Sequence, residues 1–194
     1  METLTEHKNS MRKALFAARK QAHGSAVGAA EAARDHFLAS RLLTGVEVVS
    51  GYCPIRTELD VMPLMDALHD AGHRVCVPVI QSAGQALRFH EWWPGVEMQD
   101  GPFGAQVPKG TQALEPELVI APLVGFDRAG WRLGYGGGFY DRSLEALRAK
   151  RRTRAFGYAY AAQELDAVPI ETTDQRLDGV VTELGVIRPL VEDI

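Results

Sequence analysis

The chain has 194 residues, of which 46% are hydrophobic and 24% are charged, a composition that excludes the disordered and fibrous classes of protein. Its formal net charge of -4 gives no overall positive field, so we expect neither nucleic acid nor an anionic membrane as a partner. The chain is long enough to bury most of its apolar surface in one core, and we expect a single domain over residues 1–194.

The N-terminal segment is charged and has no apolar stretch of the kind that directs export. No run in the sequence approaches the roughly 20 apolar residues that a membrane span needs. Cys53 and Cys76 lack the spacing of a redox or metal motif and are expected to be reduced residues in or near the core. We therefore predict a cytoplasmic protein.

Two helices are predicted at the start of the chain. Thr3 and Glu6 match a capping box, and the helical period of apolar residues then continues to His23. Ser25 is a candidate N-cap for a second, alanine-rich helix that ends near Leu43.

Strands alternate with helices in the rest of the chain. We expect strands at 46–52, 74–80, 87–93, 118–126, 154–160 and 179–184, and helices at 59–71 and 143–150. Residues 94–117 are rich in Pro and Gly and are predicted to form a long loop without regular structure. The strand, helix, strand order favours parallel pairing. We therefore predict an α/β fold with three layers, helix, sheet and helix, around a mixed, mainly parallel sheet.

A glycine-rich segment follows the most apolar predicted strand. The sequence "RLGYGGGFYDR", from Arg132 to Arg142, has glycine at four of the five positions from 134 to 138. Backbone N–H groups at the start of the following helix favour an anion, and glycines let them approach phosphate oxygens closely. A sharp corner between a strand and a helix, the structural alternative, needs only one or two glycines. The spacing matches neither a P-loop nor a dinucleotide fingerprint, so the segment predicts a phosphate-binding loop of another kind.

Charged residues near this segment have a functional and a structural interpretation. Arg132 could bind a phosphate with two hydrogen bonds and Asp141 could bind Mg²⁺, or they are a surface arginine and an acid that stabilises the start of a helix. Lys8, Arg12 and Arg19 share one face of the first helix. They either form the rim of a binding cleft or belong to a solvated face.

The glycine-rich segment is part of a longer pattern. The stretch "PLVGFDRAGWRLGYGGGFYDR" is preceded by "KNSMR" and "TELD" and is followed by "DQRLDGVVTELGVI". In this order the motifs resemble the 5-formyltetrahydrofolate cyclo-ligase family, also called 5,10-methenyltetrahydrofolate synthetases, over nearly the whole chain. The resemblance implies an enzyme that uses ATP and Mg²⁺ to cyclise 5-formyltetrahydrofolate to 5,10-methenyltetrahydrofolate, with release of ADP and phosphate. We expect the formyl oxygen to be phosphorylated before N10 closes the ring.

The resemblance also implies roles for individual residues. ATP contacts are implied for Lys8, Arg12, Arg132, Leu133, Gly134, Tyr135, Gly136, Gly137, Gly138, Phe139 and Tyr140. Folate contacts are implied for Cys53, Glu58, Tyr135, Gly136, Gly137, Gly138 and Phe139, and metal ligation for Asp141 and Asp174. Lys8, Arg12 and Arg132 are the expected catalytic residues because they would stabilise the transferring phosphoryl group. Glu58 also fits an acid that begins a helix, and Asp174 also fits a turn residue.

The chain departs from the family pattern at two positions. Thr173 stands where the family usually has His, and Val107 stands where it often has Glu. Residues 148–154 are basic and, besides ending a helix, could attract a polyglutamate tail of the folate.

Two other functions remain open from the sequence alone. One is a phosphosugar isomerase or acyl-transfer enzyme of similar fold, and the other is a folate or nucleotide binding protein without turnover. ATP consumption separates the first from a cyclo-ligase. We expect a monomer.

Overall fold

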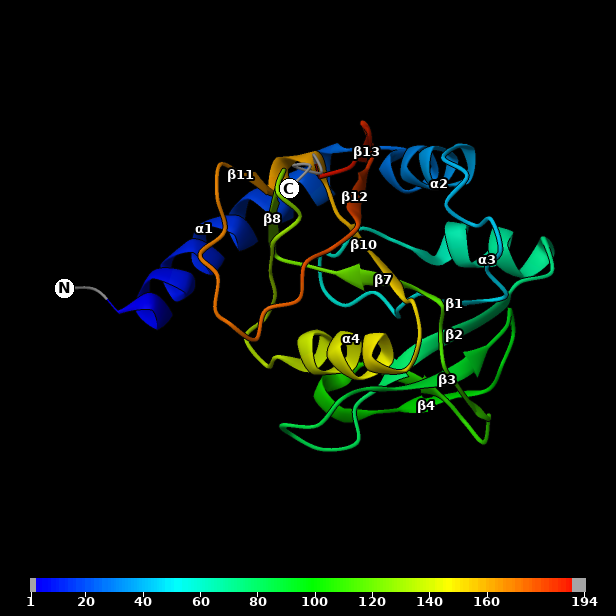
Figure 1. Ribbon diagram of the computed structural model, residues 1–194. Helices are drawn as coiled ribbons and strands as arrows, with labels where there is room; N and C mark the ends of the chain where they lie inside the picture. Colours follow the sequence, from blue (N-terminus) through cyan, green and yellow to red (C-terminus); the bar gives the residue numbers. More distant parts are fainter. Residues whose placement is uncertain (1–2, 190–194) are drawn as a thin grey trace.

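The structure is a computed structural model that describes residues 3–189, apart from the side chain of Phe103. Its helices are α1 (Leu4–Ser25), α2 (Ala29–Ala39), α3 (Met62–Asp70) and α4 (Phe139–Lys150), with short 3-10 turns η1 (Pro102–Gly104) and η2 (Ala161–Gln163). Its strands are β1 (Val48–Ser50), β2 (Arg74–Val79), β3 (Arg88–Trp92), β4 (Met98–Asp100), β5 (Gln106–Pro108), β6 (Ala113–Leu114), β7 (Leu118–Pro122), β8 (Gly125–Asp127), β9 (Arg132–Leu133), β10 (Arg154–Tyr158), β11 (Glu164–Leu165), β12 (Gly179–Thr182) and β13 (Gly185–Ile187). Figure 1 shows their arrangement.

One sheet of eight strands, in the order β13-β12-β10-β7-β1-β2-β3-β6, forms the centre of the molecule. The five strands from β12 to β2 are parallel to one another. The outer strands β13, β3 and β6 pair antiparallel. The predicted α/β class with a mixed, mainly parallel sheet is confirmed.

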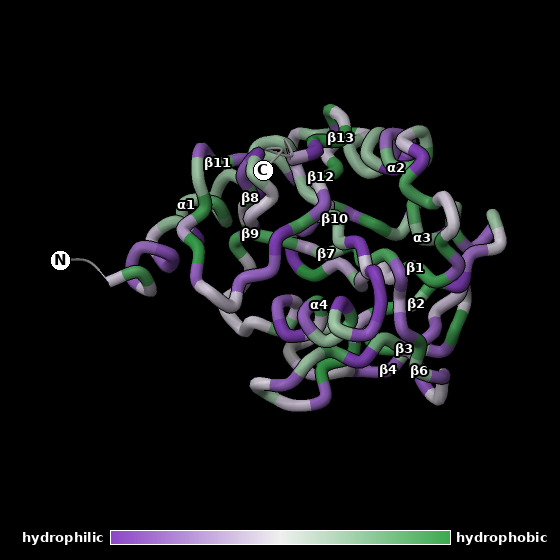
Figure 2. The backbone as a smooth tube through the Cα atoms, in the orientation of Figure 1, coloured by the Kyte–Doolittle hydropathy of each residue, from purple (hydrophilic) through white to green (hydrophobic). Residues whose placement is uncertain are grey.

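Helices cover both faces of this sheet, as the apolar character of its central strands requires. On one face Phe37 of α2 and Leu64 of α3 pack with Ile120 of β7 in one apolar cluster. On the other face Leu144 of α4 packs with Val119. In Figure 2 the tube of α4 alternates between hydrophilic and hydrophobic colours, as expected of a helix with one buried side.

The start of the chain shows one correct and one wrong prediction. The side chain of Thr3 accepts a hydrogen bond from the backbone of Glu6, and the reciprocal bond is also present, so the capping box is confirmed. Ser25 does not begin the second helix. It lies in the last turn of α1, where its hydroxyl donates to the Gln21 carbonyl at 2.9 Å. Gly28, in the left-handed region at φ +78°, precedes α2, which ends at Ala39 rather than near Leu43.

The other differences concern how strands pair and where one helix begins. Residues 94–117 are not irregular throughout, because β4 pairs with β5 and β6 joins the edge of the main sheet. The predicted strand 118–126 is two strands, of which β8 belongs to a separate sheet with β9 and β11. The helix predicted at 143–150 begins earlier, at Phe139, and strand β13 extends the main sheet beyond β12.

The order of the strands places a crevice at one edge of the sheet. From β1 the chain passes through α3 to β2, whereas from β7 it passes through α4 to β10 on the other side. Such a reversal separates the loops at the carboxyl ends of the two strands and opens a binding crevice between them. Among the described residues, no helix has the length and apolar character needed to cross a membrane.

Candidate functional site

A cavity of 690 Å³ lies where the strand order predicts it. Tyr52 and Cys53, which follow β1, and Pro122 at the end of β7 contribute to its wall. All the residues predicted to contact ATP, folate or metal line this one cavity: Lys8, Arg12, Cys53, Glu58, Arg132, Leu133, Gly134, Tyr135, Gly136, Gly137, Gly138, Phe139, Tyr140, Asp141 and Asp174. The fold therefore brings together segments from the whole length of the chain.

The glycine-rich segment connects β9 to α4 along one wall of the cavity. Gly136 and Gly138 have φ of +100° and +62°, a region that residues with a Cβ atom rarely adopt. Gly138 is the N-cap of α4, and a Cβ there would lie 2.7 Å from a guanidinium nitrogen of Arg142. Backbone geometry thus explains Gly136 and Gly138, which lie at the N-terminus of a helix of 12 residues, where the helix dipole favours an anion.

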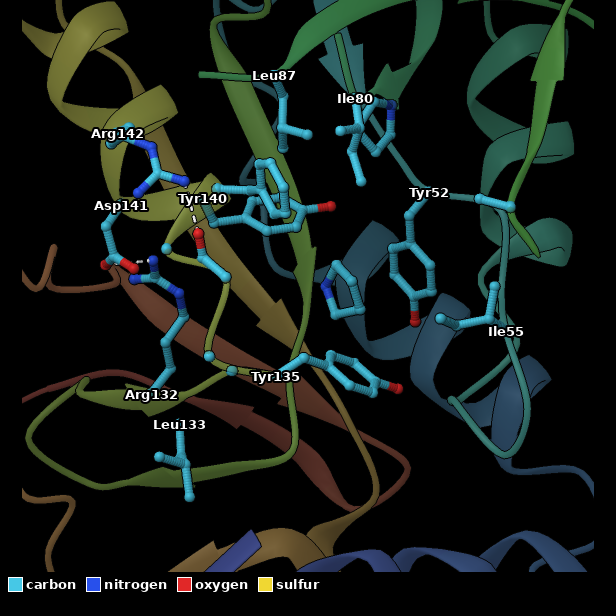
Figure 3. Close-up of a pocket in the computed structure, with 18 of the residues that line it drawn as sticks. Tyr52, Ile55, Ile80, Leu87, Arg132, Leu133, Tyr135, Tyr140, Asp141 and Arg142 are labelled. Atoms are coloured by element: carbon cyan, nitrogen blue, oxygen red, sulfur yellow. Dashed lines mark hydrogen bonds and ion pairs between the residues drawn. The ribbon is translucent and has the colours of Figure 1, made fainter. Parts of the chain in front are cut away.

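The predicted cations and carboxylates form ion pairs with one another. The Lys8 ammonium donates to Glu171 at 3.0 Å and to Asp174 at 3.1 Å. The Arg132 guanidinium donates to an Asp141 oxygen at 2.6 Å. We call these five residues the ionic side of the cavity. Figure 3 shows Arg132 and Asp141 facing each other there.

Backbone contacts connect the two pairs. The guanidinium of Arg132 also donates to the carbonyl of Gln175, and the N–H of Gln175 donates to Asp141 at 2.9 Å. Gln175 follows Asp174 directly, so both carboxylates belong to one arrangement. Among the described residues, no group of three or more His, Cys, Asp and Glu side chains is placed to hold a metal ion.

Arg12 holds the glycine-rich segment from α1. Its Nε donates to the carbonyl of Gly134 at 2.8 Å, and a second nitrogen donates to Asn9 at 2.7 Å. Burial lowers the pKa of Arg12, and the nearby carboxylates of Glu171 and Asp174 oppose that change. Arg12 is therefore a cation that contacts the glycine-rich segment and interacts electrostatically with two carboxylates of the ionic side.

The opposite wall is mostly apolar. It is formed by Tyr52, Cys53, Ile55, Ile80 and Leu87, and we call these residues the apolar side. Figure 3 shows Tyr52, Ile55, Ile80 and Leu87 across the cavity from Arg132 and Asp141. Burial raises the pKa of the Cys53 thiol to about 11. The group therefore stays protonated at neutral pH, as expected of a lining residue rather than a nucleophile.

Glu58 is a buried carboxylate next to the apolar side. One oxygen accepts a hydrogen bond from the Tyr135 hydroxyl at 2.9 Å, and the other accepts one from the Ile55 N–H at 2.9 Å. Burial raises the pKa of Glu58, whereas these two hydrogen bonds and the charge of Arg19 lower it. The structure thus places a buried acceptor between the apolar wall and the glycine-rich segment.

The sequence did not single out several residues that line the cavity. Glu171 pairs with Lys8, and its backbone N–H donates to Asp174 at 2.8 Å. Its position three residues before Asp174 is a sequence feature from which this contact could have been predicted. Arg142 donates to the carbonyl of Gly137 at 2.5 Å and lies 5.4 Å from the centre of the Phe139 ring.

The Tyr140 hydroxyl is another group at the cavity with a distinctive environment. It is buried, without a hydrogen-bond partner among the described residues, and burial raises the pKa of this phenol well above its ordinary value. Figure 3 shows the hydroxyl directed into the cavity. Nothing in the local sequence distinguishes it from a tyrosine of the helix core.

The basic segment 148–154 lies away from this site. α4 contributes residues to the cavity wall as far as Glu145, and none of residues 148–154 is among the residues that line the cavity. Its side chains already have acidic partners, since Arg148 pairs with Asp178 at 3.2 Å, Lys150 with Glu115, and Arg151 with Glu117 at 3.8 Å. The geometry therefore gives no support to binding of a polyglutamate tail by this segment.

Known proteins share both the sequence and the fold. A family model described as the 5-formyltetrahydrofolate cyclo-ligase family matches residues 4–183. The protein named 5-formyltetrahydrofolate cyclo-ligase of Escherichia coli strain K12 is 39% identical over 132 residues, which cover 64% of this chain and 71% of that protein. The protein of the same name from Mycolicibacterium smegmatis is 29% identical over 185 residues, covering 90% of this chain and 93% of that one.

A solved structure supports the fold independently. The NMR structure of 5,10-methenyltetrahydrofolate synthetase from Aquifex aeolicus superposes with a TM-score of 0.77 at 24% identity, covering 93% of this chain and 92% of that one. At this identity the likeness concerns the fold alone. The family match spans almost all of the described residues, including every element that lines the cavity. The chain therefore belongs to the 5-formyltetrahydrofolate cyclo-ligase family.

Proposed function

We propose that this chain cyclises 5-formyltetrahydrofolate to 5,10-methenyltetrahydrofolate, using ATP and Mg²⁺ and releasing ADP and phosphate. The observation that carries the proposal is a single cavity with an ionic side next to a glycine-rich helix start and an apolar side next to a buried carboxylate. The two substrates match these two sides, because the triphosphate of ATP is highly charged whereas the pterin of folate is flat with a polar edge. One cavity of this kind suits both substrates together.

The phosphates of ATP would bind at the glycine-rich segment. Backbone N–H groups at the start of α4 and the cations Lys8, Arg12 and Arg132 are directed to the same region. These groups would stabilise the charge of the transferring phosphoryl group without having to move far. We propose Lys8, Arg12 and Arg132 as the catalytic residues on this ground.

Asp141 and Asp174 are the residues that would hold Mg²⁺. Two carboxylates, without a third acidic or imidazole ligand among the described residues, suit a hard cation that keeps waters and takes phosphate oxygens as further ligands. The metal would supply charge neutralisation on the phosphates. Each carboxylate is paired with a cation, so both ion pairs would open if Asp141 and Asp174 held the metal and Lys8 and Arg132 contacted phosphate.

The folate would bind against the apolar side. Glu58 accepts hydrogen bonds from neutral donors and could accept them from N–H groups of the pterin in the same way. Cys53, Tyr135 and Phe139 line the same space, and the glycines between the last two allow the ring to approach the backbone. The formyl group would then lie between the pterin site and the phosphates.

The chemistry follows from the poor reactivity of an amide. The formyl oxygen attacks the γ-phosphorus of ATP, the bond to the β-phosphate oxygen breaks, and ADP leaves. N10 then attacks the activated formyl carbon, loses its proton, and phosphate departs as the ring closes. The protein contributes position and charge neutralisation, and no step requires a protein nucleophile.

The test mixes the protein with 5-formyltetrahydrofolate, ATP and Mg²⁺ and follows the absorbance of the methenyl product. A rise that depends on ATP is expected, and its absence would refute the proposed function. A sugar-phosphate isomerase or a binding protein without turnover would show neither product nor ADP. In the Asp141→Asn variant we expect little product, and an unchanged rate would refute the metal assignment alone.

We also propose one domain and a monomer. One sheet includes strands from Val48 to Ile187, and every group described above as lining the cavity comes from the same chain. A site of this kind needs no residue from a second copy, and size-exclusion chromatography with light scattering tests the monomer directly. A cytoplasmic location remains a prediction from the sequence.

A further inference from the structure

Arg19 is a buried charge that the proposed chemistry does not use. It lies on α1 with only 1% of its surface exposed, and it is among the largest fully buried side chains of the described residues. Within residues 3–189, one of its guanidinium nitrogens is buried without a hydrogen-bond partner. Burying a cation with an unsatisfied donor costs free energy that an apolar side chain of similar size would avoid. A role other than packing is therefore needed to explain this residue.

The contacts of Arg19 lead to two residues of the site. Its Nε donates to the hydroxyl of Thr57 at 3.2 Å, and another nitrogen lies 3.9 Å from an oxygen of Glu58. The guanidinium carbon lies 5.3 Å from the centre of the Phe16 ring and 5.5 Å from the centre of the Tyr135 ring. These distances are within the range of attraction between a cation and an aromatic face.

Tyr135 is the one position in residues 134–138 that has a side chain. It is therefore the one residue of the stretch that can be held by its own side chain, whereas Arg12 and Arg142 hold the stretch through backbone carbonyls. The Tyr135 ring packs on Phe16, with ring centres 5.6 Å apart, and its hydroxyl donates to Glu58 at 2.9 Å. Arg19 thus contacts the carboxylate and the ring that are joined by this hydrogen bond.

We propose that Arg19 is a positioning residue that holds the Glu58 carboxylate and the Tyr135 ring together, and so fixes the folate site relative to the glycine-rich segment. The inference rests on the proposed function, because it takes Glu58 as the group that binds folate. Arg19 does not line the cavity and acts only through these two residues.

The charges around Glu58 make the effect of Arg19 measurable. Two cations, Arg19 and Arg56, and three phenols, Tyr52, Tyr135 and Tyr140, interact with this carboxylate. Arg56 is exposed, so solvent screens its charge, whereas Arg19 is buried. Without Arg19, the rise in the Glu58 pKa caused by burial is opposed only by the neutral hydrogen-bond donors and the screened charge of Arg56. Its pKa then rises further, and the carboxylate is lost at a higher pH.

The first measurement follows the Glu58 carboxyl by ¹³C NMR in the protein without substrates. In Arg19→Met we expect the pKa of Glu58 to rise by about one pH unit or more, whereas Arg19→Lys, which keeps the charge, stays closer to the wild type. Lys20→Met makes the same substitution at an exposed neighbour on α1 and is expected to leave the titration unchanged. No rise in Arg19→Met would overturn the proposal.

The second measurement is the dissociation constant of 5-formyltetrahydrofolate from pH 5 to 9, obtained by calorimetry. The ionised carboxylate binds the pterin, so affinity is lost as pH falls through the pKa of Glu58. In Arg19→Met this loss should begin at higher pH, with about tenfold weaker binding where Glu58 is protonated in the variant alone. On a Glu58→Gln background the Arg19 substitution should no longer alter the pH dependence. A pH shift that persists there means that Arg19 does not act through Glu58.

A milder variant covers the case in which Arg19→Met does not fold. Thr57→Val removes only the hydroxyl that accepts from Arg19, and we expect changes of the same direction but smaller size. Unchanged titration and affinity in this variant would then count against the proposal. If the wild type binds no 5-formyltetrahydrofolate, the proposed function fails, while the NMR titration still decides whether Arg19 controls Glu58.

Discussion

The two sides of the cavity treat charge in opposite ways. On the ionic side the cations and carboxylates occur in pairs, and Glu171 and Asp141 remain partly open to solvent. Beside the apolar side the carboxylate of Glu58 is buried and held by neutral donors and one buried guanidinium. Partly exposed pairs can exchange partners when a charged ligand arrives. A buried carboxylate has no such freedom and must be in place before the ligand binds.

The largest effect is expected from breaking the ionic side at Arg132. In Arg132→Ala the transition state loses a buried cation. By analogy with the loss of an oxyanion donor, its stabilisation should fall by about 2 to 4 kcal/mol, which lowers kcat/KM roughly 30- to 900-fold. Steady-state kinetics with methenyl absorbance measures the change. Arg128→Ala is the matched control, because Arg128 pairs with Glu164 at an exposed position outside the cavity. Loss of activity in that control would point to general destabilisation.

The metal dependence of nucleotide binding tests partner exchange directly. We expect Mg²⁺ to strengthen ATP binding to the wild type by at least about tenfold, and Asp141→Asn to abolish most of that enhancement. Calorimetry with and without Mg²⁺ gives the ratio. Asp166→Asn, an exposed aspartate outside the cavity, should keep the wild-type ratio. The same enhancement in both variants would refute a metal site at Asp141.

The buried carboxylate predicts a pH effect on stability of the opposite sign to that of an ordinary ion-paired acid. Because burial raises the pKa of Glu58 in the folded protein, the folded state binds its proton more tightly than the unfolded chain does. The contribution of Glu58 to stability is therefore largest at low pH and falls as pH rises through the raised pKa. The stability of Glu58→Gln relative to the wild type, measured as the difference in free energy of unfolding, should therefore be greater at pH 8 than at pH 5. Thermal melts at both values measure this, and a reversed order would contradict it.

The smallest effect is expected at Glu171. Its side chain is 50% exposed, and Lys8 keeps Asp174 as a second partner, so the pair contributes little to stability. Glu171→Gln removes a negative charge close to the proposed phosphate site, and KM for ATP should fall by about two- to fivefold at low salt. The difference should shrink as ionic strength increases. A higher KM would mean that Glu171 assists nucleotide binding rather than opposing it.

Local signals explain which parts were predictable from the sequence. The capping box of Thr3 and Glu6 and the glycines before Phe139 act within a few residues, so the sequence shows them directly. Strand β6 pairs with β3 only because the sheet brings them together, and β8 leaves the main sheet to pair with β9 and β11. β6 and β11 lie more than 20 residues from the strands they pair with, and no local pattern specifies such partners.

The site shows the same division. The residues for which the resemblance implied roles all line the cavity, whereas Glu171 and Arg142 beside them were missed. The motifs did not show that Lys8 and Arg132 are paired with the acidic residues, nor that Arg19 is buried while Lys20 beside it is exposed. Pairing and burial depend on how α1 packs across the glycine-rich segment, which is a property of the whole fold.

The contact between Lys8 and Asp174 joins residues that are 166 positions apart. During translation the first helix leaves the ribosome long before the acidic turn has been synthesised. A nascent chain therefore presents Lys8 without the carboxylate that pairs with it in the folded protein. The ionic side can be completed only after residue 174 has been synthesised, so this part of the cavity forms late in the folding of a new chain.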